Sequence, residues 1–315
     1  MSIWNELKQY LTEFRIDQAE GCQKIFHGPS GKLPGLESLI IDRMSHVIFV
    51  ISYNVLLTED LSELVHILNE SFPAHYLRIQ ERGQGPSRDL YVSADMPECS
   101  TVTEADGLFQ IHPGRGQNIG FFPDMINGRS RIRNYLKQRE SRAIVLNLFS
   151  YTCAFSVAAL QGGASRVDNW DMNRNSLRIG KDNHDQNGFD VRAKKSRYFA
   201  HDILKSLAKV RKNGPYDLII MDPPPFQRTS FTYTRDYPKL IRRTEEWLKE
   251  GGACLFCLNA SDCSWQDFEL MIRDSLSGEF ENWENVSPPE KFIGRYPDRG
   301  LKSYFLTGWQ VKKNH

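Results

Sequence analysis

The sequence predicts an α/β protein, in which a mostly parallel sheet with flanking helices follows a small α+β domain. Residues 216–221 form an apolar, isoleucine-rich run of the kind that is buried on both faces of a parallel sheet. Residues 143–149 form a second such run, followed by a short loop and then by residues 155–160, which fit the first turns of a helix. Because strand, loop, helix and strand alternate, the parallel arrangement is favoured.

The strand at 216–221 ends abruptly in three prolines. Proline has no amide donor and fixes φ, so the chain must leave the sheet stiffly at the carboxyl end of the strand. Open α/β sheets bind ligands at that edge. We therefore take Asp222, Pro223, Pro224 and Phe226 as candidate catalytic residues that orient a planar substrate. The alternative is a proline-capped buried strand with a solvated aspartate.

Acidic or amide side chains lie near the ends of four successive predicted strands. The strand at 143–149 contains Asn147, and residues 165–170 predict a second strand that ends at Asp171. An acidic residue at that tip, about 20 residues beyond the first loop, is placed to accept hydrogen bonds from ribose hydroxyls. A third strand at 196–201 ends at Asp202, and the fourth ends at Asp222.

These residues together resemble a known family. The segments VLNLFSYTCAFSVAALQGGASRVDNWDMN, DNHDQNGF and DLIIMDPPPF are similar to class I S-adenosylmethionine-dependent methyltransferases. More narrowly, they resemble bacterial 23S ribosomal RNA methyltransferases that act on cytosine C5 or guanine N7. The similarity continues upstream through CQKIFHGPSGKLPGLESLIIDR, HYLRIQERGQG and DGLFQIHPGRGQNIGFFPDMINGR, and so covers roughly residues 21 to 260.

The resemblance implies a Rossmann-like methyltransferase domain with a mostly parallel seven-stranded sheet, and S-adenosylmethionine as cofactor. It assigns the methionine end of the cofactor to Asp124 and Arg129, the ribose to Asp171 and the adenine amino group to Asp202. The full set of implied cofactor-binding residues is Asp124, Arg129, Asn147, Phe149, Ser150, Tyr151, Thr152, Asp171, Met172, Asp202, Ile203 and Asp222. The family has glycine in the cofactor loop where this chain has Cys153, although glycine there lets the backbone approach the ligand.

We predict three parts along the chain: a helix in residues 1–20, a small α+β domain in residues 21–106, and the methyltransferase domain in residues 107–315. The small domain is expected to contain strands at 39–42, 47–53 and 76–80 and a helix at 61–72. A hairpin with Gly114, Gly116 and Gly120 is expected from Gly107 onward. Residues 1–20 are too short for the extra RNA-binding module of the related cytosine enzymes.

Composition narrows the class of protein. Hydrophobic content of 40% and charged content of 25% are ordinary for a globular protein. The amphipathic N-terminus lacks the apolar core of a signal peptide, and no apolar stretch has membrane-spanning length, so we expect a cytoplasmic protein without a membrane partner. Cys254 and Cys257 have CxxC spacing, but residues three apart on a strand point to opposite faces, so we expect no metal.

Charge is distributed unevenly along the chain. Up to Gln110 there are eight Lys and Arg against 16 Asp and Glu, and beyond it 32 against 23. A basic catalytic region fits a polyanionic partner, which we expect to be RNA. Basic residues gather at Arg129, Arg131, Arg133, Lys137, Arg139 and Arg142, and again at Lys194, Lys195 and Arg197. The alternative is a solvated helix face, except that Arg129 matches a family arginine near the cofactor and should point inward.

The predicted chemistry depends on the position that a nucleophilic cysteine would occupy. Methylation of cytosine C5 needs a thiolate that adds to C6. By register with the cytosine branch, that position falls on Asn259, although a shifted register would promote Cys257 or Cys263. The guanine-N7 branch also has asparagine there, and a ring nitrogen with its own lone pair needs only positioning.

We therefore predict a methyltransferase that acts on RNA, at a base nitrogen of ribosomal RNA. The alternatives are a methyltransferase of a protein or small molecule and a catalytically degenerate cofactor-binding member of the family. The C-terminal segment with Arg295, Tyr296, Arg299 and Lys302 is expected to form either the substrate wall or the last hairpin of the sheet.

Overall fold

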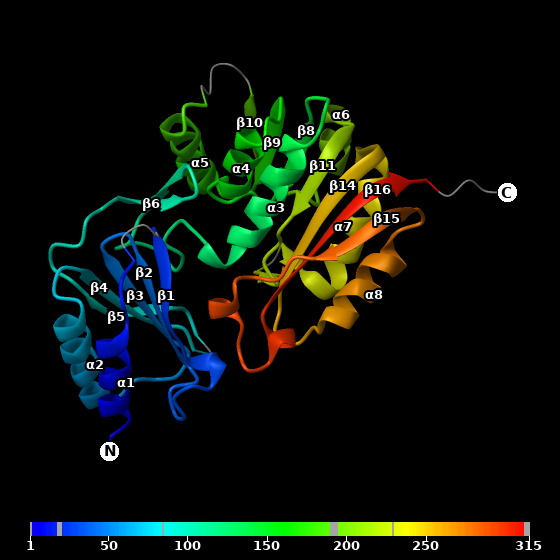
Figure 1. Cartoon of the computed structure of the whole chain (residues 1–315). Helices are drawn as coiled ribbons and strands as arrows, with labels where there is room; N and C mark the ends of the chain where they lie inside the picture. The colour runs from blue at the N-terminus through cyan, green and yellow to red at the C-terminus, as the bar shows by residue number, and fades with distance from the viewer. Residues whose placement is uncertain (1, 18–20, 84, 190–194, 229, 312–315) are drawn as a thin grey trace. The chain divides into compact units, whose positions relative to one another are not determined.

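Figure 1 shows the computed structural model, which describes residues 2–17, 21–83, 85–189, 195–228 and 230–311. The chain divides into two compact units. Unit 1 is Met1–Pro123 with Glu290–Pro297, and unit 2 is Asp124–Pro289 with Asp298–His315. The boundary predicted between residues 106 and 107 stays a prediction.

Unit 1 is a mixed five-stranded sheet covered by two helices. The helices are α1 (Ile3–Glu13) and α2 (Thr58–Ser71), and the strands follow chain order as β1 (Cys22–His27), β2 (Leu39–Met44), β3 (Val47–Ser52), β4 (Tyr76–Glu81) and β5 (Arg88–Val92). Only β3 and β4 are parallel, because α2 carries the chain back between them. Leu7 and Leu64 of the two helices share a core with Ile41 and Val50 of the sheet. The predicted α+β class is confirmed.

One detail of unit 1 differs from the expectation. The hairpin consists of β6 (Ser100–Glu104) and β7 (Gly107–Ile111), so it turns at Ala105, where φ is +49°. Gly114, Gly116 and Gly120 lie in the segment after the hairpin rather than in its turn. The glycines indicated a change of chain direction, but the first strand of the hairpin lies before Gly107 and was not predicted.

Unit 2 is a seven-stranded sheet between two layers of helices. Its helices are α3 (Ile126–Lys137), α4 (Ala154–Gln161), α5 (Arg174–Gln186), α6 (Leu207–Asn213), α7 (Tyr233–Trp247) and α8 (Trp265–Ser275). The sheet contains β8 (Ile144–Leu148), β9 (Arg166–Asp171), β10 (Ser196–Ala200), β11 (Tyr216–Met221), β14 (Leu248–Asn259), β15 (Glu279–Asn285) and β16 (Leu301–Gln310), and a separate small hairpin contains β12 (Phe226–Gln227) and β13 (Phe231–Thr232).

The strand order in the large sheet is β10-β9-β8-β11-β14-β16-β15. The first five strands are parallel, and β16 is antiparallel to both of its neighbours. The predicted mostly parallel, seven-stranded sheet is therefore confirmed. From β8 the chain builds outward to β10, then returns and builds the other way from β11. This reversal between β8 and β11 is the place where open α/β sheets bind ligands.

Alternating side chains of the buried strands fill two separate cores. Ile219 and Met221 of β11 face a core shared with α7 and α8, whereas Leu218 and Ile220 face a core shared with α3 and α4. Helices therefore cover both faces, as a two-sided apolar strand requires and as Figure 1 shows. Because both faces are covered, the carboxyl edge of the parallel strands is left for a ligand.

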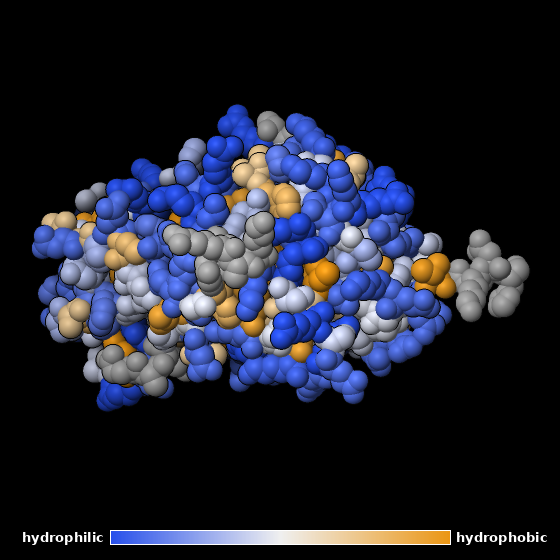
Figure 2. Space-filling view, turned by 90° about the horizontal axis from the view of Figure 1, so that it is seen from above, coloured by the Kyte–Doolittle hydropathy of each residue, from blue (hydrophilic) through white to orange (hydrophobic). Residues whose placement is uncertain are grey.

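Hydrophilic residues cover most of the face shown in Figure 2, and hydrophobic residues lie there in small groups. Among the residues whose structure is described, no helix is long and apolar enough to cross a membrane.

Candidate cofactor and substrate site

The loop after β8 has an unusual backbone. Phe149, Tyr151 and Cys153 have φ values of +56°, +46° and +64°, which are rare for residues with a side chain. Three alternate residues in this conformation store strain, and such strain is characteristic of ligand-binding turns. Cys153 occupies a left-handed position that favours glycine, which explains why the family has glycine there.

Asp171 at the tip of β9 holds this loop in place. Its carboxylate accepts hydrogen bonds from the backbone N–H of Tyr151 at 2.9 Å and from that of Asn173 at 2.7 Å. Burial raises the pKa of Asp171, against the lowering effect of these two backbone N–H groups. A carboxylate has about four lone-pair positions, so acceptor capacity remains for ribose hydroxyls.

Helix α5 packs against the loop that follows β8. A Cβ atom on Gly180 would lie only 2.4 Å from the Cys153 Sγ, so the cysteine side chain fills the space that this glycine leaves. Asn183 donates from Nδ2 to the backbone oxygen of Thr152 at 2.8 Å. The sequence prediction missed Gly180 and Asn183, although DNHDQNGF was among the segments that resemble the family.

Beside Asn183, buried His184 links α5 to its neighbours. Its Nε2 is 2.8 Å from the Ser156 hydroxyl of α4, and its Nδ1 is 2.9 Å from the Tyr198 hydroxyl of β10. Burial lowers the pKa of His184 to about 4, so this side chain is neutral near pH 7. It therefore acts as a hydrogen-bonding link between elements that surround the loop.

Two carboxylates and one arginine meet at the end of β11. Burial raises the pKa of Asp222 to about 7, and the negative charge of Asp124 raises it further, while the positive charge of Arg129 opposes the shift. Arg129 is 1% exposed, so the prediction that it points inward is confirmed. The structure thus brings together residues that lie almost 100 positions apart in the sequence.

The three prolines lead into the small hairpin of β12 and β13. The backbone N–H of Tyr233 donates to the Pro225 oxygen at 3.0 Å, which closes the turn. Phe231 packs edge-on against Phe149 of the cofactor loop, with ring centroids 5.1 Å apart. Phe226 is 64% exposed. The hairpin therefore presents a solvent-accessible aromatic ring next to the loop, as the catalytic prediction requires.

The remaining predicted cofactor residues differ in their exposure. Met172 is exposed and accepts a 3.8 Å contact at its sulfur from the Ser230 hydroxyl. The Asp202 carboxylate accepts from the backbone N–H of Lys205 at 3.4 Å. Asn147 is buried and donates to Asn169 of the adjacent strand. Buried side chains also occur at Ser150, Thr152 and Ile203.

No cysteine at this edge is suited to act as a nucleophile. Cys257 is fully buried, accepts a contact from the Ser303 hydroxyl, and has a pKa that burial raises well above its ordinary value. Burial also raises the pKa of Cys263. Asn259, in contrast, is exposed at the end of β14. Cys254 and Cys257 face the two different cores, as the strand prediction required.

Several of the basic residues predicted between Arg129 and Arg142 have partners within the protein. Arg131 donates to Glu284 at 2.8 Å, Arg133 donates to Gln161 at 2.9 Å, and Arg139 lies 3.4 Å from Asp217. Lys137 and Arg142 are exposed. Of the second group, Lys194 lies outside the described residues.

Of the four C-terminal residues named above, only Lys302 lies in the last hairpin of the sheet, in β16, whereas Arg295, Tyr296 and Arg299 lie in the segment between β15 and β16. Lys302 is fully buried, and its ammonium group donates to the backbone oxygens of Ala260, Asp298 and Gly300 at 2.7 to 2.9 Å. This lysine therefore fixes the loop before β16 and does not form part of a substrate wall.

The side chains at this edge fit S-adenosylmethionine. Ribose hydroxyls need an acceptor such as Asp171, an adenine amino group needs an acceptor such as Asp202, and a carboxylate needs a cation such as Arg129. Buried Ile203 and exposed Met172 add apolar surface for a planar ring.

Comparison with known proteins identifies the family. Residues 23–307 match the model of the S-adenosylmethionine-dependent methyltransferase family. The chain belongs to this family, which confirms the predicted family, fold class and cofactor.

The chain is also similar to two named bacterial proteins. The chain is 35% identical over 228 residues to ribosomal RNA large subunit methyltransferase I of Vibrio vulnificus strain CMCP6, covering 69% of this chain and 54% of that protein. It is 31% identical over 296 residues to the protein of the same name from Aliivibrio fischeri strain MJ11, covering 88% and 70%. The chain thus spans about half the length of the first of these relatives.

Two solved structures show the same fold. The crystal structure of SMU.776 complexed with SAH has a TM-score of 0.79 at 24% identity, covering 97% of this chain and 80% of the other. The complex of aTrm5 and tRNALeu has a TM-score of 0.60 at 14% identity, covering 85% and 70%.

Proposed function

We propose that the protein transfers the methyl group of S-adenosylmethionine to a base nitrogen of ribosomal RNA, and therefore acts in the cytoplasm, where ribosomes are. The observation that carries this proposal is the juxtaposition at the β11 end: Asp222, the proline turn and the exposed ring of Phe226 lie beside the cofactor loop, and no reactive thiol is present among the described residues there. The names of the two relatives support ribosomal RNA as the substrate.

In this proposal the cofactor supplies a methyl group on a sulfonium sulfur, which leaves as a neutral thioether. The loop from Phe149 to Thr152 would hold it, Asp171 would bind its ribose, and Asp202 with Ile203 would bind its adenine. Asp124 and Arg129 would bind its methionine end. Asp222 and Phe226 would orient the base, so that a nitrogen lone pair points at the methyl carbon without a covalent intermediate.

Asp222 has a second use in the proposed reaction. A carboxylate with a pKa near 7 both accepts a hydrogen bond from a base N–H and takes a proton at neutral pH. Phe226 stacks on the flat face of the base, because an exposed ring contributes contact area at little entropic cost. Asp222 therefore holds the edge of the base, and Phe226 holds its face.

The first experiment measures cofactor binding by titration calorimetry with S-adenosylmethionine and S-adenosylhomocysteine. Asp171→Ala should weaken binding by about 1–3 kcal/mol, because it leaves ribose hydroxyls unpaired and releases the Tyr151 N–H. Lys181→Ala, at an exposed position on α5, is the matched control and should bind like the wild type. Absence of heat from the wild type would contradict cofactor binding and favour the degenerate binding protein.

The second experiment tests the chemistry with ribosomal RNA and methyl-labelled cofactor, followed by mass spectrometry of the nucleosides. Asp222→Ala should lower turnover by about 100-fold or more. Replacing Cys254, Cys257 and Cys263 together by alanine should leave turnover within about tenfold, and the product should be an N-methylated base. A covalent adduct with 5-fluorocytosine RNA, or complete inactivity of one folded cysteine variant, would establish C5 chemistry instead.

A further inference from the structure

Helix α7 carries a row of cations along its exposed face. Arg235, Lys239 and Arg242 are spaced by four and three residues, so they project from one side of the helix. The side chains of Arg235 and Lys239 are 64% and 59% exposed. Arg243 follows on the edge of the same face. Four cations therefore line a helix whose opposite face is packed in the core.

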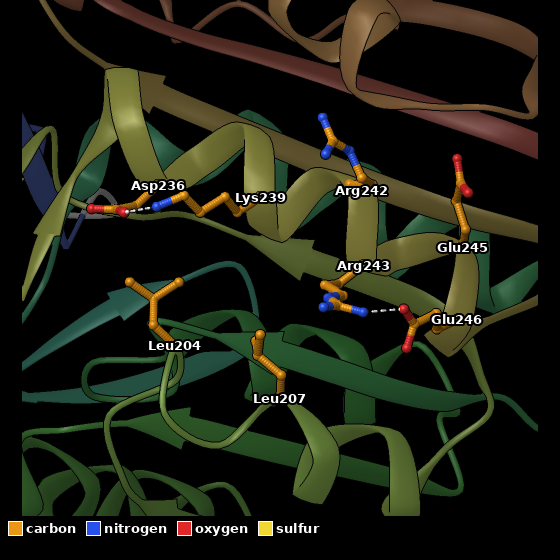
Figure 3. Close-up of a pocket in the computed structure, with 8 residues that line it drawn as sticks. All are labelled: Leu204, Leu207, Asp236, Lys239, Arg242, Arg243, Glu245 and Glu246. Atoms are coloured by element: carbon orange, nitrogen blue, oxygen red, sulfur yellow. Dashed lines mark hydrogen bonds and ion pairs between the residues drawn. The ribbon is translucent and has the colours of Figure 1, made fainter.

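A groove with about 580 Å³ of space runs beside this row. Leu204 and Leu207 line it from the side of α6, and both pack against the core beneath. Figure 3 shows Arg243 pointing from α7 toward these leucines, whereas Arg242 lines the groove from the other edge of the helix. The groove thus combines an apolar side with a cationic one.

The acidic groups of the groove are already engaged. The side chains of Arg235 and Lys239 and the backbone N–H of Thr232 donate to the Asp236 carboxylate and hold its pKa well below its usual range, so both cations share their charge with this aspartate. Glu246 pairs with Arg243, and Glu245 accepts a hydrogen bond from the Ser277 hydroxyl at 2.6 Å. Arg242, in contrast, has no ion pair with any described residue. The two segments 202–213 and 233–247 contain eight Lys and Arg against four Asp and Glu.

We propose that this groove between α6 and α7 binds the phosphodiester backbone of the RNA substrate. The inference rests on the proposed function and adds to it the surface that holds RNA beside the target base. The row begins at the catalytic edge, because the Thr232 N–H of the hairpin donates to Asp236 in the first turn of α7. The eight residue-to-residue steps from Arg235 to Arg243 span about 12 Å, enough for three or four nucleotides at about 3.4 Å each.

An RNA strand fits both sides of the groove. Phosphates would meet the cations of α7, and ribose or base surfaces would pack on Leu204 and Leu207. This assignment differs from the expectation that residues 129–142 contact phosphates, although in both segments most cations have partners within the protein.

The test compares two charge-matched double variants. Lys239→Gln with Arg242→Gln removes two cations of the groove, and Lys137→Gln with Arg142→Gln removes two exposed cations on or just after α3. Binding of a labelled single-stranded RNA and of ribosomal RNA is measured across a salt series. The groove variant should bind about tenfold more weakly at low salt, with a salt slope smaller by about 1.4, because each lost phosphate contact removes about 0.7.

The control variant should keep the wild-type slope, and both variants should bind S-adenosylhomocysteine like the wild type. If the double variant does not fold, Arg242→Gln alone serves, with an expected slope change of about 0.7. A wild type that binds RNA, together with a loss in the α3 variant only, would overturn the groove assignment and leave the proposed function intact.

If the wild type shows no salt-dependent RNA affinity, both the proposed function and the groove assignment fail. Competition by polyglutamate as effective as that by RNA of equal charge would make the groove a site for an acidic protein and would also overturn the proposal.

Discussion

At the scale of single residues, Asp222 is a carboxyl group whose pKa burial raises to about 7. Asp222 follows a fully buried strand. The negative charge of Asp124 also raises its pKa, and the positive charge of Arg129 offsets only part of this shift. The result is a carboxyl group that titrates near neutral pH. Such perturbed groups are frequent in active sites, where they hold or release protons.

This perturbation predicts a pH dependence of stability. The folded-state pKa of Asp222, about 7, is above the unfolded value of about 4. Its contribution to stability is therefore full below about pH 4 and is lost as the pH rises through 7. Asp222→Asn, which cannot ionise, should raise the free energy of unfolding at pH 8 by about 1–3 kcal/mol. Urea unfolding at pH 5 and pH 8 measures the difference.

The matched control for that measurement is Asp274→Asn, at an exposed carboxylate on α8. It should leave the pH dependence as it is in the wild type. Equal pH profiles for the wild type and for Asp222→Asn would show that Asp222 titrates normally in the folded protein.

At the scale of elements, the contact between α5 and the cofactor loop shows how this chain accommodates its departure from the family. Cys153 is fully buried, and its thiol occupies the space above Gly180. Its side chain thus lies against the helix. The loop keeps its left-handed backbone at residue 153, and the Thr152 oxygen is held by Asn183. The cysteine and the glycine act as a packing pair.

Gly180→Ala should consequently be destabilising, although alanine is normally favoured over glycine in a helix. The new methyl group would meet the Cys153 sulfur, so we expect a loss of about 1–3 kcal/mol in stability and weaker binding of S-adenosylhomocysteine. Combining Gly180→Ala with Cys153→Gly should restore both quantities. Thermal unfolding measures the stability of the two single variants and the double variant, and calorimetry measures their binding of S-adenosylhomocysteine. If the effects of the two substitutions simply add in the double variant, the two residues do not act as a packing pair.

At the scale of the whole molecule, the proposed cofactor residues all belong to unit 2. A ligand stabilises only the cooperative unit that binds it. S-adenosylhomocysteine at about 100 times its dissociation constant should stabilise unit 2 by about 2.7 kcal/mol. Differential scanning calorimetry should show two transitions, of which the ligand shifts one. An equal shift of both transitions, or a single transition that moves as a whole, would contradict this prediction.

The matched control is Asp171→Ala, in which the ligand-induced shift should shrink while the other transition stays in place. This readout does not depend on the identity of the RNA substrate. It therefore tests the location of the cofactor separately from the reaction.

The sequence by itself determined the sheet and the main chemistry of its edge. Buried parallel strands are read as continuous apolar runs, so β11 and β8 were located to within a residue at each end, and Asp222 after β11 followed. At residue 153 the family glycine indicated a close approach of the backbone to the ligand, whereas the left-handed φ of +64° is known only from the structure. These are local properties, carried by a few adjacent residues each.

Only the tertiary structure decided which distant residues meet. The approach of Asp124 and Arg129 to Asp222, the packing of Gly180 on Cys153, and the burial of Lys302 all join segments far apart in the chain. The same holds for charge, since the arginines of residues 129–142 resemble a surface for RNA in the sequence, whereas the structure shows Arg131 and Arg139 paired with carboxylates. Side-chain partners across elements depend on how helices pack on the sheet, and that packing is set by the fold as a whole.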